Sequence, residues 1–168
     1  MLRLAMTLYM IGHSNIEMKA LLALLRQHEI ALLVDVRSQP YSRHSPQFSR
    51  EPLQRSLTQN DIAYLHLGAH LGGRPADRTL YLDNGKVNYA RLAESSAYLT
   101  GIERLLTLAE EQRTALMCAE ADYHHCHRYW LITRTLVERG ISVNHILPTG
   151  ELAESFAKEF EAAQPSLF

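Results

Sequence analysis

The chain has 168 residues, of which 46% are hydrophobic and 21% are charged, and its formal net charge is −1. This length suits one domain with a buried core, so we expect residues 1–168 to fold as a single domain. The average composition argues against disorder, and the near-neutral charge argues against binding to nucleic acid or a membrane surface through bulk charge. No hydrophobic run approaches the roughly 20 residues that cross a bilayer, so we expect no membrane partner.

The cysteine count and the start of the chain bear on the cellular compartment. The first six residues lack the apolar core and small-residue cleavage site of a secretory signal, and the chain holds two cysteines. In a protein without an export signal, cysteines are reduced thiols or ligands. We therefore expect a cytoplasmic protein.

Five apolar, β-rich runs punctuate the chain, at Thr7–Ile11, Ala31–Val36, Ala63–Leu67, Thr114–Met117 and Ser142–Leu147. Helical patterns lie between and after these runs, at Glu17–His28, Glu51–Asn60, Tyr89–Gln112 (one or two helices), the stretch after Asp122, and Glu151–Ala163. Asn15 is the expected N-cap of the first helix. The alternation predicts an α/β fold, a three-layer domain with a mostly parallel sheet of about five strands and helices on both faces.

Two long connections, Ser38–Arg50 and Gly68–Asn88, carry positive charge. Residues 37–55 hold four arginines and one glutamate, and Tyr41 and Phe48 are interleaved with the arginines. Residues 68–91 hold four basic and two acidic residues. This pattern suits an anionic ligand with a stackable ring, such as a nucleotide or single-stranded nucleic acid. A solvated loop is the alternative interpretation.

Polar, chemically capable groups follow four of the predicted strands. They are Gly12-His13-Ser14-Asn15, then Asp35 and Arg37, then His66 with Gly72-Gly73-Arg74, and finally Cys118 and Glu120. In a parallel sheet these strand ends lie at one edge, where ligands bind in open α/β sheets. The sequence therefore predicts a site there.

Roles within that site follow from residue chemistry. Anion binding is expected from a helix N-terminus and from cations, and the candidates are Ser14, Asn15, Arg37, Arg74 and Arg128. Proton transfer is expected from Asp35 or Glu120, assisted by His13. Each residue also has a structural alternative, since Asp35 can orient Arg37 and His13 can bond its own turn.

Cys118 holds the strand-end position of a catalytic thiol. Glu120 and Asp122 follow closely, and we expect these carboxylates to disfavour a thiolate. Cys118 is thus expected first as a packed small residue, with a nucleophile as the alternative.

The run His124-His125-Cys126-His127 invites a metal interpretation. Consecutive helical residues point about 100° apart and cannot all ligate one ion. Cys126 shares a helical face with Tyr129, Trp130, Thr133, Leu136 and Val137, which predicts a core residue. No cofactor is therefore expected. Zinc or iron remains an alternative, with the ligand set Cys118, Glu120, His125 and His127.

These motifs resemble a known family. The segments Ile11-Gly12-His13-Ser14-Asn15, Val34-Asp35-Val36-Arg37-Ser38 with Pro46-Gln47-Phe48, Leu71-Gly72-Gly73-Arg74, and Met117-Cys118-Ala119-Glu120 with His125-Cys126-His127-Arg128 are similar to those of the family catalogued as domain of unknown function 488. The resemblance runs from about residue 7 to 147 and implies that these motifs are the family's signature, without implying a reaction. The loop between Arg74 and Tyr89 departs from it.

A weaker resemblance is to rhodanese-type sulfurtransferases, which also place Asp-Val-Arg at one strand end and a cysteine at a later one. No arginine follows Cys118 until Arg128, so the compact cysteine loop of that family is missing. The resemblance implies shared architecture only.

The expected function is that of an enzyme, a hydrolase or group transferase, acting on a small anionic, phosphate-bearing or nucleotide-like substrate at the C-terminal edge of the sheet. The first alternative is a module that binds nucleotides or nucleic acid without turnover. The second is a metal-binding protein.

Overall fold

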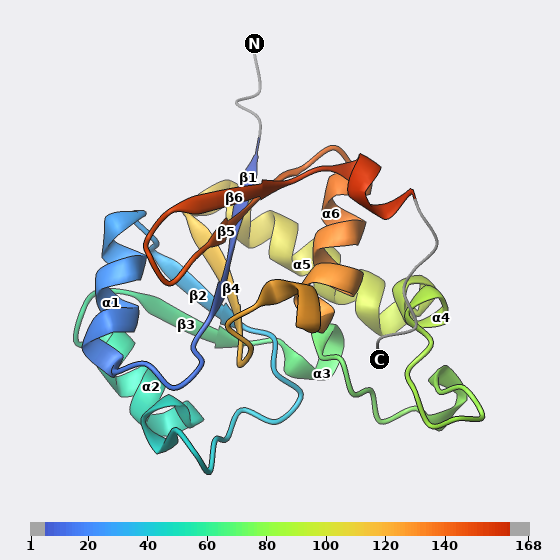
Figure 1. The fold of residues 1–168 in the computed structure, drawn as a ribbon, viewed down its shortest axis with the longest axis horizontal. Helices are drawn as coiled ribbons and strands as arrows, with labels where there is room; N and C mark the ends of the chain where they lie inside the picture. Colours follow the sequence, from blue (N-terminus) through green and yellow to red (C-terminus); the bar gives the residue numbers. More distant parts are fainter. Residues whose placement is uncertain (1–5, 162–168) are drawn as a thin grey trace.

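The computed structural model describes residues 6–161, and its centre is a six-stranded sheet of order β3-β2-β4-β1-β5-β6 (Figure 1). The strands are β1 Thr7–Gly12, β2 Leu32–Asp35, β3 Ala63–His66, β4 Thr114–Cys118, β5 Ser142–Ile146 and β6 Leu152–Ser155. The pairs among β1 to β5 are parallel and β6 pairs antiparallel with β5. The predicted α/β class with a mostly parallel sheet is confirmed.

Helical segments connect the five parallel strands, and a turn connects β5 to β6. The α-helices are α1 Met18–Gln27, α2 Arg50–Thr58, α3 Gly68–Leu71, α4 Tyr89–Glu94, α5 Ser96–Glu111 and α6 Arg134–Glu138. Short 3-10 turns cover Pro46–Phe48, Arg78–Leu80, Tyr123–His125 and Ala157–Phe160, and a π-helix covers Arg128–Thr133. None of the helices within residues 6–161 combines the length and apolarity that a membrane span requires.

Helices cover both faces of the sheet and make three layers (Figure 1). On one face, α1 and α2 bury Leu21 and Leu53 against strand residues such as Ile11. On the other, α5 and α6 bury Ile102 and Leu136 against Met10 and its neighbours. Successive residues of β1 therefore face opposite cores, as the period of two of a strand requires.

The C-terminal ends of β1 and β4 form a topological switch point. The two strands are neighbours, with Gly12 opposite Cys118. The chain leaves β1 toward α1 on one face and leaves β4 toward α6 on the other. Connections that diverge in this way leave a crevice where open α/β sheets bind ligands.

The prediction of a final helix at Glu151–Ala163 is wrong over the described part of that range. Gly150, with φ of 87°, ends a turn, and β6 then returns antiparallel to β5 as a sixth strand. The ladder satisfies the backbone groups along the open side of β5, and this pairing outweighs the local helical pattern. A 3-10 turn follows at Ala157–Phe160, and residues 162–163 lie outside the described range.

The prediction of Asn15 as the cap of the first helix is also wrong. Helix α1 begins at Met18 after Glu17, which has an extended backbone and makes no side-chain cap bond. The helical stretch at 89–112 is two helices, because the Ser95 side chain accepts from the Tyr98 N–H and starts α5 anew.

The buried centre of the sheet should dominate the free energy of unfolding. Leu116 in β4 is fully buried, whereas Leu82 in the 68–88 connection is 45% exposed. We expect Leu116→Ala to lower the free energy of unfolding by about 2–5 kcal/mol through lost burial and a cavity. We expect Leu82→Ala to change it by about 0.5 kcal/mol or less. Urea titration followed by circular dichroism measures both, and equal losses would contradict this assignment of the core.

Candidate functional site

The pairing of β1 with β4 continues past the ends of both strands through backbone hydrogen bonds. The His13 N–H donates to the Cys118 carbonyl (3.0 Å) and the Ser14 N–H donates to the Ala119 carbonyl (2.8 Å). At Gly12 a Cβ atom would lie 1.7 Å from the Glu120 carbonyl oxygen and 2.7 Å from Nη1 of Arg128. The close approach of the 118–121 loop therefore requires glycine in β1.

Cys118 ends β4 as a buried thiol surrounded by donors. Nη1 of Arg128 lies 3.1 Å from its Sγ atom. Burial alone raises the pKa of Cys118, but the Cys126 thiol, the Arg128 charge and the Glu120 backbone N–H together outweigh burial and lower that pKa from 9.0 to about 7. The donors around the sulfur thus favour its ionised form.

Arg128 is 1% exposed and lacks a carboxylate partner among residues 6–161. Its Nη2 donates to the Ala121 carbonyl (3.4 Å), and within the same residues its Nε finds no acceptor. A buried guanidinium without a counter-charge is strongly unfavourable. The Cys118 thiolate supplies that counter-charge.

A π-helix places Arg128 at the strand end. Arg128 is the first residue of this helix, Arg128–Thr133, and its carbonyl accepts from the Thr133 hydroxyl (2.7 Å). Such wide turns are rare and recur at functional sites. Cys126, Tyr129, Thr133, Leu136 and Val137 are buried as predicted, while Trp130 is half-buried.

The expectation that two carboxylates disfavour the thiolate does not hold. The side chains of Glu120 and Asp122 are exposed, and Asp122 accepts from the backbone and ring of His124. The loop turns these carboxylates outward, toward solvent, whereas the Glu120 backbone N–H turns inward toward the sulfur and lowers its pKa.

Asp35, Arg37 and His13 form a second, closed network at the same edge. Arg37 donates to both Asp35 oxygens (2.8 and 2.7 Å), and the Tyr64 hydroxyl donates to the Oδ2 atom (2.7 Å). Arg37 also donates to the Phe48 carbonyl (2.8 Å), which ties the 38–50 loop to the sheet. Every oxygen of Asp35 is thus engaged, and this geometry suits an orienting role.

His13 is held in one neutral form. Its Nδ1 lies 2.7 Å from the Ser14 carbonyl and carries the hydrogen, so Nε2 accepts from Nη1 of Arg37 (3.2 Å). Burial lowers the pKa of His13 to about 4. The ring stacks near Phe48, with centroids 4.6 Å apart, so Phe48 is buried and unavailable to a ligand.

The other predicted anion ligands are dispersed. Asn15 is exposed, and Ser14 lies in a left-handed turn (φ of 44°) four residues before the start of α1, so neither stands at the helix N-terminus. Arg74 is exposed, and its backbone N–H donates to the Ser38 hydroxyl (2.9 Å). Gly73 packs against His127, since a Cβ there would lie 2.7 Å from the ring.

The alternative metal ligands do not converge. His125 is exposed beside Asp122, while His127 Nε2 donates to the Val36 carbonyl (3.2 Å). Across residues 6–161, no three His, Cys, Asp or Glu side chains come together in a group that could hold a metal ion.

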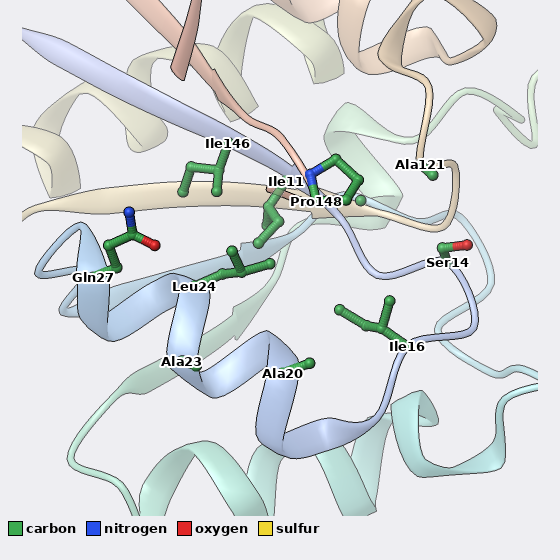
Figure 2. A pocket seen from close by; sticks show the side chains of 11 residues that line it. Ile11, Ser14, Ile16, Ala20, Ala23, Leu24, Gln27, Ala121, Ile146 and Pro148 are labelled. Carbon is green, nitrogen blue, oxygen red and sulfur yellow. The ribbon is translucent and has the colours of Figure 1, made fainter. Parts of the chain in front are cut away.

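A cavity of about 220 Å³ between α1 and the sheet was not predicted (Figure 2). Its apolar lining includes Ile16, Leu24 and Ile146, and it reaches the strand ends at Gly12 and Ala121. Those two residues also contact the Arg128 guanidinium. One signal was readable in the sequence: Ala20, Ala23 and Gln27 lie on the same face of α1 as Leu24, and the two alanines are too small to close that face.

The family model described as domain of unknown function DUF488 matches residues 17–135, more than half of the chain. The chain belongs to the DUF488 family. No curated protein and no solved structure matches it. Family membership names no reaction, so the site itself must carry the functional argument.

The ionisation of Cys118 is directly testable. We expect ultraviolet absorbance to report a thiolate titrating with a pKa of about 7, which Cys118→Ser removes. Because this pKa lies below 9.0, the ionisation contributes fully to stability above pH 9 and that contribution is lost as pH falls toward 7. Arg128→Gln should raise the pKa by at least about one unit.

Arg74→Gln is the matched control for that titration. Arg74 is the exposed arginine of the predicted anion set, and its removal should leave the thiolate signal in place. A titration that Arg128→Gln does not shift would contradict the ion pair.

Proposed function

We propose that this DUF488 protein is a group-transfer or hydrolytic enzyme whose nucleophile is the Cys118 thiolate, acting on a small anionic substrate at the β1–β4 crevice. The observation that carries the proposal is the 3.1 Å contact between Cys118 and a buried arginine that lacks a carboxylate partner in the described chain. A thiolate of matched pKa at a strand end is the arrangement that covalent catalysis uses.

In this mechanism Cys118 attacks the electrophilic centre of the substrate with its sulfur lone pair, and the bond to the leaving group breaks. The Arg128 guanidinium loses part of its ion pair as the sulfur charge is consumed. Its positive charge is then no longer balanced by the sulfur. That charge and the Nε–H, which has no acceptor, bind the anionic group of the substrate. Water, or a second substrate, releases the covalent adduct and regenerates the thiolate.

Glu120 is the better proton carrier of the two predicted carboxylates. Its side chain is exposed and makes no hydrogen bond or ion pair within residues 6–161, whereas Asp35 is held by Arg37 and Tyr64. In its acid form Glu120 protonates the leaving group, and as a carboxylate it then activates the attacking water. The cavity beside Gly12 provides space for an apolar part of the substrate.

A covalent adduct is the sharpest test of this proposal. A panel of chromogenic phosphate, sulfate and carboxylate esters is incubated with the protein, quenched and measured by intact-mass spectrometry. We expect an adduct on Cys118 with any ester that turns over. Cys118→Ser should abolish the adduct and lower kcat by on the order of 10³-fold or more. Turnover that Cys118→Ser leaves unchanged would refute the nucleophile.

The second candidate is a binding module for nucleotides or single-stranded nucleic acid. Tyr41 is 59% exposed, and Arg43 and Arg50 of the same loop are exposed beside it. The burial of Phe48 removes one of the two rings that the stacking interpretation used. The loop is thus a smaller platform than its sequence indicates.

Paired variants separate the two candidates. For an enzyme, Glu120→Gln should lower kcat by about 10²-fold or more and change KM little, because a general acid acts mainly in the transition state. Arg43→Gln should have little effect on kcat. For a binder, Arg43→Gln should weaken binding of a labelled oligonucleotide, affinity should fall steeply with salt, and Glu120→Gln should have no effect. Fluorescence anisotropy and steady-state kinetics provide these readouts.

A further inference from the structure

The two cysteines of this chain meet at one residue. The Arg128 guanidinium lies 3.1 Å from the Cys118 sulfur, and the Arg128 backbone N–H lies 3.5 Å from the Cys126 sulfur. The two side chains also influence one another, since the Cys126 thiol lowers the pKa of Cys118. Both cysteines are free in this structure. The covalent mechanism proposed above gives Cys126 no chemical step.

The environment gives the two sulfurs different chemistry. Burial and the neighbouring Cys118 sulfur raise the pKa of Cys126 well above its ordinary value, while the pKa of Cys118 is lowered. Cys118 is therefore the sulfur that ionises first, and Cys126 keeps its proton to higher pH. This division of roles is that of an oxidation-sensitive cysteine poised next to a resolving cysteine.

His127 completes the arrangement. Its Nε2 lies 3.2 Å from the Val36 carbonyl, and its Nδ1 lies 3.6 Å from the Cys126 sulfur. When Nε2 carries the hydrogen and donates to Val36, the Nδ1 lone pair can accept from the Cys126 thiol. The Cys126 hydrogen thus has a nitrogen acceptor within reach when its sulfur becomes a nucleophile.

We propose that Cys118 and Cys126 are a redox couple in which hydrogen peroxide oxidises Cys118 and Cys126 resolves the product to an intramolecular disulfide. In the first step the Cys118 sulfur attacks one peroxide oxygen, the O–O bond breaks, and a sulfenic acid and water form after protonation of the departing hydroxide. In the second step the Cys126 sulfur attacks the sulfenic sulfur and an S–S bond forms. The hydroxide leaves and takes the Cys126 hydrogen, through His127, as water. Two thiols are oxidised and one peroxide is reduced.

Burial selects both the oxidant and the resolving group. Cys118 is 3% exposed and Cys126 is 5% exposed, so a small oxidant reaches the sulfurs more readily than a bulky thiol such as glutathione. The internal thiol is then the route that spares Cys118 from irreversible oxidation. The regulatory consequence, a reversible loss of the nucleophile, rests on the proposed function, whereas the redox chemistry itself does not.

Mass spectrometry after peroxide treatment tests the couple without any substrate. Arg113 and Arg128 bound a tryptic peptide that contains both cysteines, so one peptide reports the outcome. We expect the peptide from wild-type protein to lose the mass of two hydrogen atoms and to regain it with dithiothreitol. Cys126→Ser should instead gain oxygen at Cys118 and be labelled by dimedone. Cys118→Ser should remain unoxidised at Cys126.

Three results would overturn the couple: wild-type Cys118 that accumulates oxygen without a disulfide, a disulfide that links two chains on non-reducing gels, or no reaction with peroxide. Cys126→Ala is the second variant if Cys126→Ser melts early by circular dichroism. A disulfide without any ester adduct would support the couple and refute covalent catalysis. An ester adduct without a disulfide would support covalent catalysis and refute the redox couple.

Discussion

The buried positive charge of Arg128 organises the C-terminal edge of the sheet. The Arg128 guanidinium lies between the ends of β1 and β4 with the Cys118 sulfur as its charged partner in the described chain. Leaving such a charge unpaired costs several kcal/mol, so the fold and the thiolate depend on one another. The missing side chain at Gly12, the inward Glu120 N–H and the wide helical turn that begins at Arg128 all serve this contact.

The same edge holds a second buried arginine with the opposite character. Arg37 is matched on both oxygens of Asp35 and also donates to His13 and Phe48, so its donors and its charge are consumed within the protein. Arg128 retains an unsatisfied Nε and pairs with a reactive sulfur. Arg37, whose donors are engaged within the protein, holds the loops in place. Arg128 is the arginine at which chemistry can occur.

Much of this arrangement follows from patterns that the sequence displays. The five apolar runs predicted the parallel strands, because buried strands are short and β-rich, and the polar strand ends predicted where the side chains gather. The sequence places Arg128 at the site but does not predict its contact with Cys118, because proximity in sequence differs from proximity in space. Glu120 and Asp122 follow Cys118 closely yet point outward, whereas Arg128 returns ten residues later.

The errors at the C-terminus and at α1 share a physical cause. The residues of β6 follow a pattern that also fits a helix, and only pairing with the open side of β5 decides between the two. The cavity beside α1 exists because small side chains leave space between the helix and the sheet. The periodicity of apolar residues in the sequence does not reveal such a space.

Because of the π-helix at Arg128–Thr133, inserting or deleting one residue in this segment would change the relative orientation of Arg128 and α6. Each extra residue in a helical turn rotates what lies on either side by about 100°. Loss of one residue between Arg128 and α6 would restore ordinary helical phase and turn either the guanidinium or the buried face of α6 away from its partners. Evolution can exchange side chains here by single substitutions, but an insertion or deletion of one residue would separate the site from the core.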